Sequence, residues 1–302
     1  MKIFHGLEKI GKFRKPVVAL GVFDGVHIGH RYILKEAVKK AREIKGTSVV
    51  VTFYPHPQKQ QSLYSLQHRL RLIEEIGIDA CIVINFSSAF AKIKAEDFIR
   101  KIIDGVIGAH FVYVGENFRF GLKAKGDCKL LNNFSRECGY KLKVFKVIKT
   151  NRQLISSTRI RKLITGGKLK AAQKLLLRPV TVLGTVIKGI SLARKIGFPT
   201  ANINPHHEIL PPSGVYIVKV VLDKKFFSGI CNIGRKPTVQ GHNKEKHVEV
   251  FIFNFSKNIY GKDLEIQFIK KIREERKFSS LMQLASQIAR DSKKAKNILS
   301  SY

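Results

Sequence analysis

The stretch PVVALGVFDGVHIGH, residues 16–30, sets the architecture of the first half of the chain. Residues 16–23 form a short apolar run, which is typical of a strand buried inside a parallel sheet. Leu34, Val38 and Ala41 then share one face of a helix that follows directly. Three glycines and two histidines lie around the junction. The stretch therefore predicts a buried strand, a tight loop and the start of a helix.

The next segments repeat this alternation of strand and helix up to about residue 148. Apolar runs and amphipathic segments alternate at 48–53, 66–76, 79–86, 98–106, 110–115, 127–138 and 141–148. Repeated strand–helix units favour a parallel sheet with helices on both of its faces. The first half is therefore predicted to be a Rossmann-like α/β domain.

The texture changes near residue 180, after two short helices expected at 159–165 and 168–177. Short strands separated by turn residues follow at 180–187, 214–222, 226–234, 247–255 and 263–269. This pattern predicts a small antiparallel β-barrel, with a C-terminal helix carrying an apolar stripe from Leu281 to Ile288. With the boundary at Pro179, the predicted domains are residues 1–178 and 179–302.

The composition is that of an ordinary globular protein, with 302 residues of which 44% are hydrophobic. The first ten residues hold no apolar run of the kind found in a signal peptide, and no stretch is apolar enough to span a bilayer. The four cysteines form no CxxC pair, so we expect reduced thiols. These features predict a cytoplasmic protein with no membrane partner.

The chain is strongly basic. Lysine and arginine outnumber the acidic residues by 56 to 22, and the resulting charge of +34 is spread over both halves. Such a field attracts anions, from nucleotides to nucleic acids. The alternative is that the excess of basic residues reflects only a lysine-rich composition with a solvated surface. The basic residues form no stripe interleaved with aromatic residues, so we expect no nucleic-acid partner. A weak homo-oligomer stays open.

GVFDGVHIGH stands where open α/β sheets bind ligands, beyond the carboxyl end of a strand. Gly21 and Gly25 let the backbone turn tightly and approach a ligand, and the following helix offers free N–H groups to an anion. His27 and His30 could stabilise charge on a phosphate. Two packing histidines are an alternative. A zinc site would need further ligands, which no nearby cysteine or histidine pair supplies.

A second candidate anion site is ISSTRIR, residues 155–161, which opens a helix. Ser157 and Thr158 could simply cap that helix. Together with Arg161 and the helix N-terminus they could equally hold a polyphosphate tail.

The second half carries one candidate cation site. In IGFPTANI, residues 196–203, Thr200 and Asn202 present two oxygen atoms on one face. Such oxygens suit Mg²⁺ bound together with ATP phosphates, whereas the alternative is a turn with a polar lip.

Glu249 lies among apolar residues on a predicted strand, where alternation puts it on one face with Phe251, Phe253 and Phe255. A carboxylate in such surroundings needs a partner or a task. It could be a general base in phosphoryl transfer or a salt-bridged structural residue.

The N-terminal half resembles a known family. HIGH at 27–30 followed by ISSTRIR is similar to the nucleotidyltransferase superfamily, and FYPHP at 53–57 with VGENFRFG at 114–121 resembles its FMN adenylyltransferase branch. The resemblance implies that His27 and His30 hold the ATP phosphates and stabilise the transition state. It further implies ATP contacts from Gly21, Asp24, Gly25, Asn117, Ser157, Thr158 and Arg161, and flavin contacts from His56 and Pro57.

The second half resembles a riboflavin kinase domain. The segments that carry the likeness, in order, are LGTVIKG (183–189), IGFPTAN, LPPSGVY (210–216), CNIGRKPT (231–238), VEVFIF (248–253), YGKDLEIQF (260–268) and REERKF (273–278). The resemblance implies that Thr200 and Asn202 bind Mg²⁺–ATP and that Glu249 deprotonates the riboflavin 5′-hydroxyl. Gly189 and Arg194 would belong to an ATP flap.

This chain departs from that family at three positions. Ala193 stands where the flap usually has glycine, Phe251 where a histidine is usual, and Asn254 where an acid is usual. None of these changes removes a proposed reacting group.

The leading hypothesis is a bifunctional enzyme that phosphorylates riboflavin to FMN and then adenylylates FMN to FAD, with ATP as co-substrate and Mg²⁺ as cofactor. Two alternatives are a chain in which only the adenylyltransferase half is active, and a basic nucleic-acid-binding protein on the same fold.

Overall fold

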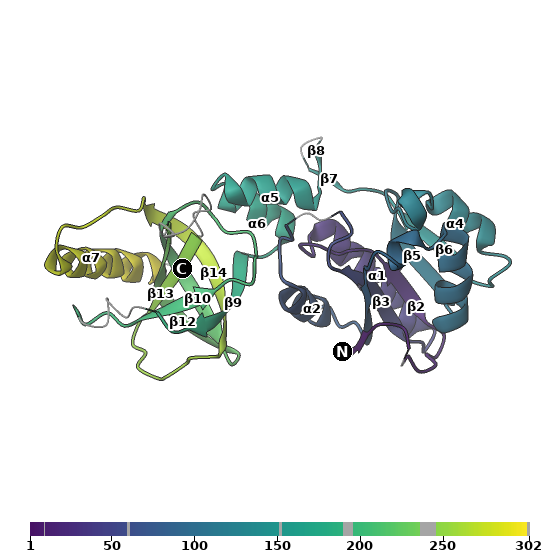
Figure 1. Cartoon of the computed structure of the whole chain (residues 1–302), viewed down its shortest axis with the longest axis horizontal. Helices are drawn as coiled ribbons and strands as arrows, with labels where there is room; N and C mark the ends of the chain where they lie inside the picture. Colours follow the sequence, from purple (N-terminus) through teal and green to yellow (C-terminus); the bar gives the residue numbers. More distant parts are fainter. Residues whose placement is uncertain (9, 59–60, 151–152, 190–195, 236–245, 301–302) are drawn as a thin grey trace. The chain divides into compact units, whose positions relative to one another are not determined.

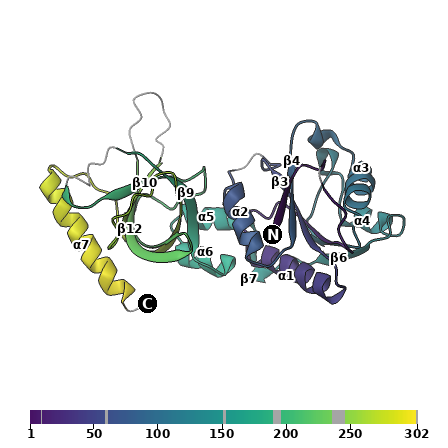
Figure 2. The ribbon, with the colours of Figure 1, turned by 90° about the horizontal axis from the view of Figure 1, so that it is seen from below.

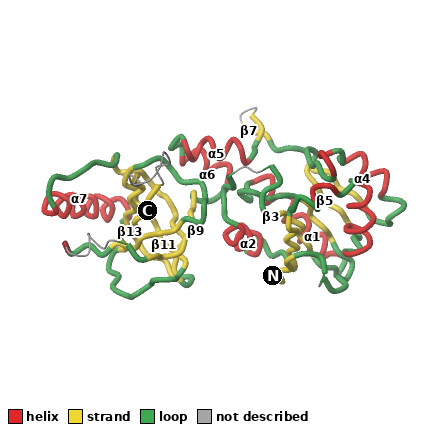
Figure 3. Tube along the Cα trace, viewed as in Figure 1, coloured by secondary structure: helices red, strands yellow, loops and turns green. Residues whose placement is uncertain are grey.

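The computed structural model describes residues 1–8, 10–58, 61–150, 153–189, 196–235 and 246–300. The chain divides into two compact units, Met1–Ser157 and Thr158–Tyr302, which Figure 1 colours along the sequence and Figure 3 colours by secondary structure. This division follows packing, and the boundary between functional domains at 178/179 stays a prediction.

The first unit is built on a six-stranded sheet in the order β1-β4-β3-β2-β5-β6, with parallel neighbours throughout. The strands are β1 (Lys2–His5), β2 (Val17–Leu20), β3 (Ser48–Tyr54), β4 (Ala80–Asn85), β5 (Phe111–Gly115) and β6 (Lys141–Phe145). The predicted parallel sheet is confirmed. Strand β1 was not expected, because this edge strand has no buried apolar run.

Helices cover both faces of this sheet, as Figure 2 shows. They are α1 (Ile28–Glu43), α2 (Leu66–Glu74), α3 (Ala95–Asp97) with the continuing π-helix η2 (Phe98–Val106), and α4 (Cys128–Phe134), with short turns η1 (Phe90–Lys92) and η3 (Leu122–Ala124). Val18 and Leu20 of β2 join one apolar cluster with Ile103 and Leu131. Two short strands of two residues each, β7 (Lys149–Thr150) and β8 (Gln153–Leu154), pair antiparallel near the end of the unit.

The second unit is a closed barrel in the order β10-β13-β12-β11-β14-β9, with every neighbouring pair antiparallel. Its elements are α5 (Ser157–Thr165, whose first residue closes the first unit), α6 (Leu169–Leu176), β9 (Val180–Ile187), β10 (Thr200–Asn204), β11 (Gly214–Leu222), β12 (Lys225–Arg235), β13 (Lys246–Ile252), β14 (Asp263–Arg273) and α7 (Leu281–Leu299). The predicted barrel and C-terminal helix are confirmed.

Helix α7 packs on the outer face of the barrel, where Ala295 joins Ile217, Ile230 and Phe253 in an apolar cluster (Figure 2). Arg273 of β14 anchors the helix, since its Nε donates to the buried Asp291 carboxylate at 2.9 Å. None of the helices in the described part of the chain is long and apolar enough to cross a membrane.

Candidate functional site

The loop between β2 and α1 has an unusual backbone. Phe23, Gly25 and Val26 have φ of +52°, +83° and +39°, so three of four consecutive residues lie in the left-handed region. A non-glycine residue in that region costs about 1–3 kcal/mol and persists only where its surroundings hold it. The loop therefore needs anchors, and three buried or half-buried polar side chains supply them: Asp24, Arg69 and Ser157.

Asp24 is the first anchor. Its side chain is buried, and its Oδ1 accepts the backbone N–H of Leu63 at 2.8 Å. Its carbonyl oxygen accepts the hydroxyl of Ser157 at 2.6 Å. Asp24 thus ties the loop both to the segment before α2 and to the first residue of α5.

Arg69 is the second anchor, and sequence reasoning missed it. Its guanidinium is buried and donates to the carbonyl of Val22 at 2.7 Å and to the carbonyl of Phe53 at 3.1 Å, so it joins the ends of β2 and β3. Burial lowers the pKa of Arg69, and the Asp24 carboxylate opposes that shift. The signal was present, because Arg69 lies on the apolar stripe of α2 between Leu66 and Leu70.

His27 and His30 stack on each other at the first turn of α1. Their ring centroids are 3.6 Å apart with an angle of 19° between the planes. His27 is the N-cap residue, and its Nδ1 accepts the backbone N–H of His30 at 3.4 Å. The edge of Phe23 packs against His30. Two imidazoles therefore lie together at a helix N-terminus, the end of a helix that favours anions.

The remaining candidates of the first unit follow strands that are neighbours in the sheet. Gly21 follows β2 and comes close to the ring of Phe23; His56 and Pro57 follow β3, and the exposed Asn117 follows β5. Parallel strands end at one edge, so these loops leave the same edge. His56 Nδ1 accepts the N–H of Gln58 at 3.2 Å.

Ser157 is the candidate from ISSTRIR that the structure joins to the loop, through Asp24. Thr158 and Arg161 lie on α5, in its first turn and one turn further along.

In the second unit, backbone register brings the candidates into one row. Asn202 of β10 is the Cα partner of Glu249 of β13, which in turn is the partner of Asn232 of β12. Thr200 lies two residues before Asn202, opposite Phe251. Asn232 was not predicted, although alternation on a predicted strand could have placed it on this face.

Gly189 lies directly against Asn202. A Cβ atom at Gly189 would collide with the side-chain amide of Asn202, so only glycine fits this approach. The Oδ1 atom of Asn202 is buried and lacks a hydrogen-bond partner within the described ranges. A buried oxygen without a donor fits a cation ligand. Arg194 lies outside the described residues.

Glu249 lies on the outer face of β13, because Val248, Val250 and Ile252 point into the core while Glu249 is half-buried. The predicted face continues to Phe253, which packs against Phe251 and joins the apolar cluster under α7, but no strand carries it on to Phe255. Strand β13 ends at Ile252, and a φ of +54° at Asn254 breaks the alternation.

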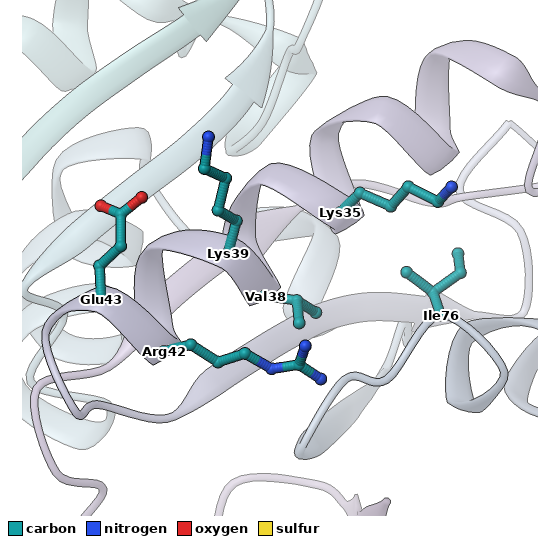
Figure 4. Close-up of a pocket in the computed structure, with 6 residues that line it drawn as sticks. All are labelled: Lys35, Val38, Lys39, Arg42, Glu43 and Ile76. Atoms are coloured by element: carbon teal, nitrogen blue, oxygen red, sulfur yellow. The ribbon is translucent and has the colours of Figure 1, made fainter.

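A pocket of about 410 Å³ lies elsewhere on the first unit and holds none of the predicted site residues. Figure 4 shows it beside α1, where Val38 and Ile76 are flanked by basic side chains. Its lining consists of Lys35, Val38, Lys39, Arg42, Glu43 and Ile76.

Comparison with known proteins covers both units. A family model described as FAD synthetase matches residues 10–159, and one described as riboflavin kinase matches residues 176–299. Three curated relatives carry the same name, bifunctional riboflavin kinase/FMN adenylyltransferase. The protein from Buchnera aphidicola subsp. Schizaphis graminum is 36% identical with 96% of each chain covered, that from Haemophilus influenzae 34% with 100% of each, and that from Bacillus subtilis 35% with 93% of this chain and 92% of the relative.

A solved structure from Streptococcus pneumoniae, named a macrolide-efflux protein, has a similar fold over both units. The TM-score is 0.84 at 30% sequence identity, with 98% of this chain and 99% of the other covered.

Proposed function

Starting from the fact that this chain belongs to the bifunctional riboflavin kinase/FMN adenylyltransferase family, we propose how its residues divide the work of two reactions. The enzyme phosphorylates riboflavin with ATP to give FMN, and it adenylylates FMN with ATP to give FAD and pyrophosphate. One observation carries this conclusion: matches to the two catalytic families follow each other along the chain and together span both units.

The adenylyl transfer belongs to the loop after β2. The phosphate of FMN is already an anion and needs no general base to attack the α-phosphorus of ATP, so catalysis consists of positioning two anions and neutralising developing charge. We assign that neutralisation to His27 and His30. Their stacking at a helix N-terminus supports this role, because donors held in advance where charge develops act without reorganisation.

The other candidate residues of the predicted adenylyltransferase domain, residues 1–178, would hold the substrates. Gly21, Gly25 and Asn117 would line the nucleotide site, Thr158 and Arg161 would meet the triphosphate, and His56 with Pro57 would contact the flavin. Asp24 and Ser157 bind each other in this structure, which supports roles in holding the loop. Since the Ser157 hydroxyl proton points to Asp24, a phosphate contact of this residue would use its backbone N–H or a rotated hydroxyl.

The kinase reaction belongs to the row on the outer face of the barrel. Glu249 would accept the proton of the riboflavin 5′-hydroxyl as that oxygen attacks the γ-phosphorus of ATP and ADP leaves. Thr200 and Asn202 would hold Mg²⁺, and the buried Oδ1 of Asn202 supports this choice. When bound, Mg²⁺ neutralises phosphate charge. Gly189 lets the backbone approach this ligand.

We also propose that the enzyme works in the cytoplasm on small-molecule substrates and binds no nucleic acid. The weak homo-oligomer stays a prediction. An RNA-binding assay at several salt concentrations tests whether the enzyme binds nucleic acid. Site-like affinity with a steep salt dependence would contradict the proposal that it does not.

The function is tested by incubating the purified chain with riboflavin, ATP and Mg²⁺ and separating the products by chromatography. We expect FMN to form first and FAD to follow. If neither flavin forms, the proposed function is wrong. A parallel reaction with FMN as the starting flavin identifies a chain in which only the adenylyltransferase half is active, because FAD would then form only in that reaction.

A further inference from the structure

His247 lies beside Glu249 on the outer face of the barrel, and its pattern in the sequence was not singled out above. It lies two residues before Glu249 on β13, so both side chains point to the same outer face of the strand. Its Nε2 lies 2.7 Å from Oε1 of Glu249. Both side chains are partly buried, with exposed fractions of 20% and 33%.

Nε2 of His247 is buried and makes no hydrogen bond in the part of the chain that the structure describes. A buried ring nitrogen without a partner is costly, and Oε1 of Glu249, 2.7 Å away, is an acceptor within reach. The N–H direction is not yet in line with this oxygen, since the pair meets the distance for a hydrogen bond but not the angle. Catalytic hydrogen bonds are often loosely aligned before substrate binds.

Burial fixes the register of the strand that carries the pair. Val248 and Val250, on either side of Glu249, are fully buried in the barrel core, and a shift by one residue would expose both. Opposite His247 stands Gly234, which has no side chain, and the carboxylate of Glu275 occupies the space where a Cβ atom of Gly234 would lie. On the other side of Glu249 the same face carries Phe251, which packs against Phe198 and cannot donate a hydrogen bond.

We propose that His247 is a positioning residue for Glu249: Nε2–H of His247 holds Oε1 of the carboxylate and leaves the second oxygen to accept the proton of the riboflavin 5′-hydroxyl. This inference rests on the proposed role of Glu249 as general base. It assigns His247 no contact with substrate, so its loss should change kcat of the kinase reaction and leave KM for riboflavin and ATP unchanged.

The test compares His247→Leu with His247→Gln, whose side-chain amide can donate to the carboxylate from the same position but does not titrate. Riboflavin kinase kcat and KM are measured, and FMN adenylylation by the same preparation reports intact protein. We expect His247→Leu to lower kinase kcat about tenfold at unchanged KM, and His247→Gln to stay within about threefold of the parent. Adenylylation should be unchanged in both.

Three outcomes overturn the proposal: unchanged kinase kcat in His247→Leu, a loss confined to KM, or equal losses in the Leu and Gln variants. If His247→Leu also loses adenylylation, its protein is not intact and a second variant is measured. This double variant combines His247→Leu with Phe251→His, which moves the hydrogen-bond donor to the other side of Glu249. Recovery of kcat there supports the proposal, and no recovery overturns it. Glu249→Gln separates this inference from the proposed function, because full kinase activity in that variant would refute the base itself.

Discussion

The two sites of this enzyme are fixed by different means. The proposed adenylyltransferase site is a loop with three residues at positive φ, and buried or half-buried polar side chains far apart in the sequence hold it in place. The proposed kinase site is a row of side chains on the outer face of a closed barrel, and strand register holds it in place. A loop site should respond to the loss of an anchor, whereas a register site should respond only to changes in the row itself or in residues that touch it.

Outside the proposed reacting groups, the largest effect is expected from Gly189→Ala. Its new Cβ would push the side chain of Asn202 out of the row, because no space exists between the two residues. We expect riboflavin kinase activity to fall by about 100-fold or more, as when a group that positions reacting atoms is displaced. FMN adenylylation should be unchanged.

Both activities are measured on one preparation, with Gly11→Ala as the control. Gly11 has open space around its Cα, so the same substitution there should affect neither reaction. If Gly189→Ala keeps full kinase activity, close approach to Asn202 does not matter for the site.

A smaller effect, in the other reaction, is expected from Asp24→Asn. The amide oxygen can still accept the Leu63 N–H, but it no longer opposes the buried charge of Arg69. Leaving a buried charge less well compensated should lower the free energy of unfolding by about 1–3 kcal/mol and slow adenylylation about 30-fold. The kinase reaction should keep its rate.

Asp79→Asn is the matched control for this prediction. Asp79 also accepts a backbone N–H, that of Ser48 at 2.8 Å, but it lies before β4 at the amino ends of the strands. Denaturant unfolding and both activity assays decide the matter. A loss of adenylylation in Asp79→Asn as large as in Asp24→Asn would mean that general stability, and not the loop, controls the rate.

Ser157→Ala should have a milder effect on the same loop. It removes one hydroxyl-to-carbonyl hydrogen bond of 2.6 Å, whose net contribution is about 1 kcal/mol, so adenylylation should slow roughly fivefold. Ser135→Ala removes a hydrogen bond of the same kind and length at the end of α4, and it should leave the rate unchanged. A loss of about 1,000-fold in Ser157→Ala would instead indicate a direct phosphate contact by the hydroxyl.

The smallest effect is expected from labelling of the buried cysteines. Each unit has one such thiol in its core. Burial raises the pKa of Cys81 to about 12, and it also raises that of Cys231 in the barrel. Because only the thiolate reacts, both thiols should resist iodoacetamide at pH 8 in the native enzyme and react in denaturant. Peptide mass spectrometry measures the labelling. Rapid native labelling of either cysteine with loss of activity would show that its unit opens readily.

More of the fold than of the candidate sites could be predicted from the sequence. Apolar runs and alternating patterns predicted five of the six sheet strands and five of the six barrel strands, because burial on one or both faces leaves a local signal. Strand β10, TANIN, escaped because its side chains include two asparagines and a threonine, which are typical of turns. The hydrogen bond from Ser157 to Asp24 joins residues 133 positions apart and left no local pattern.

Residue type, with alternation for Glu249, pointed to the candidates of the second site. Thr200 and Asn202 were chosen for their oxygen atoms, and the register of β10 with β13 places Asn202 beside Glu249. The same reasoning applied to HVEVF would have paired His247 with Glu249. Arg69 was also within reach, since a basic residue on an apolar helical stripe needs buried acceptors.

Two separate active sites in one chain are tested most directly by the flavin products of Glu249→Gln and His30→Ala, each incubated with Mg²⁺–ATP and either riboflavin or FMN. We predict that Glu249→Gln forms almost no FMN from riboflavin but converts supplied FMN to FAD, and that His30→Ala accumulates FMN from riboflavin and makes almost no FAD. Loss of both reactions in either variant, with the protein still folded, would contradict the assignment of one reaction to each unit.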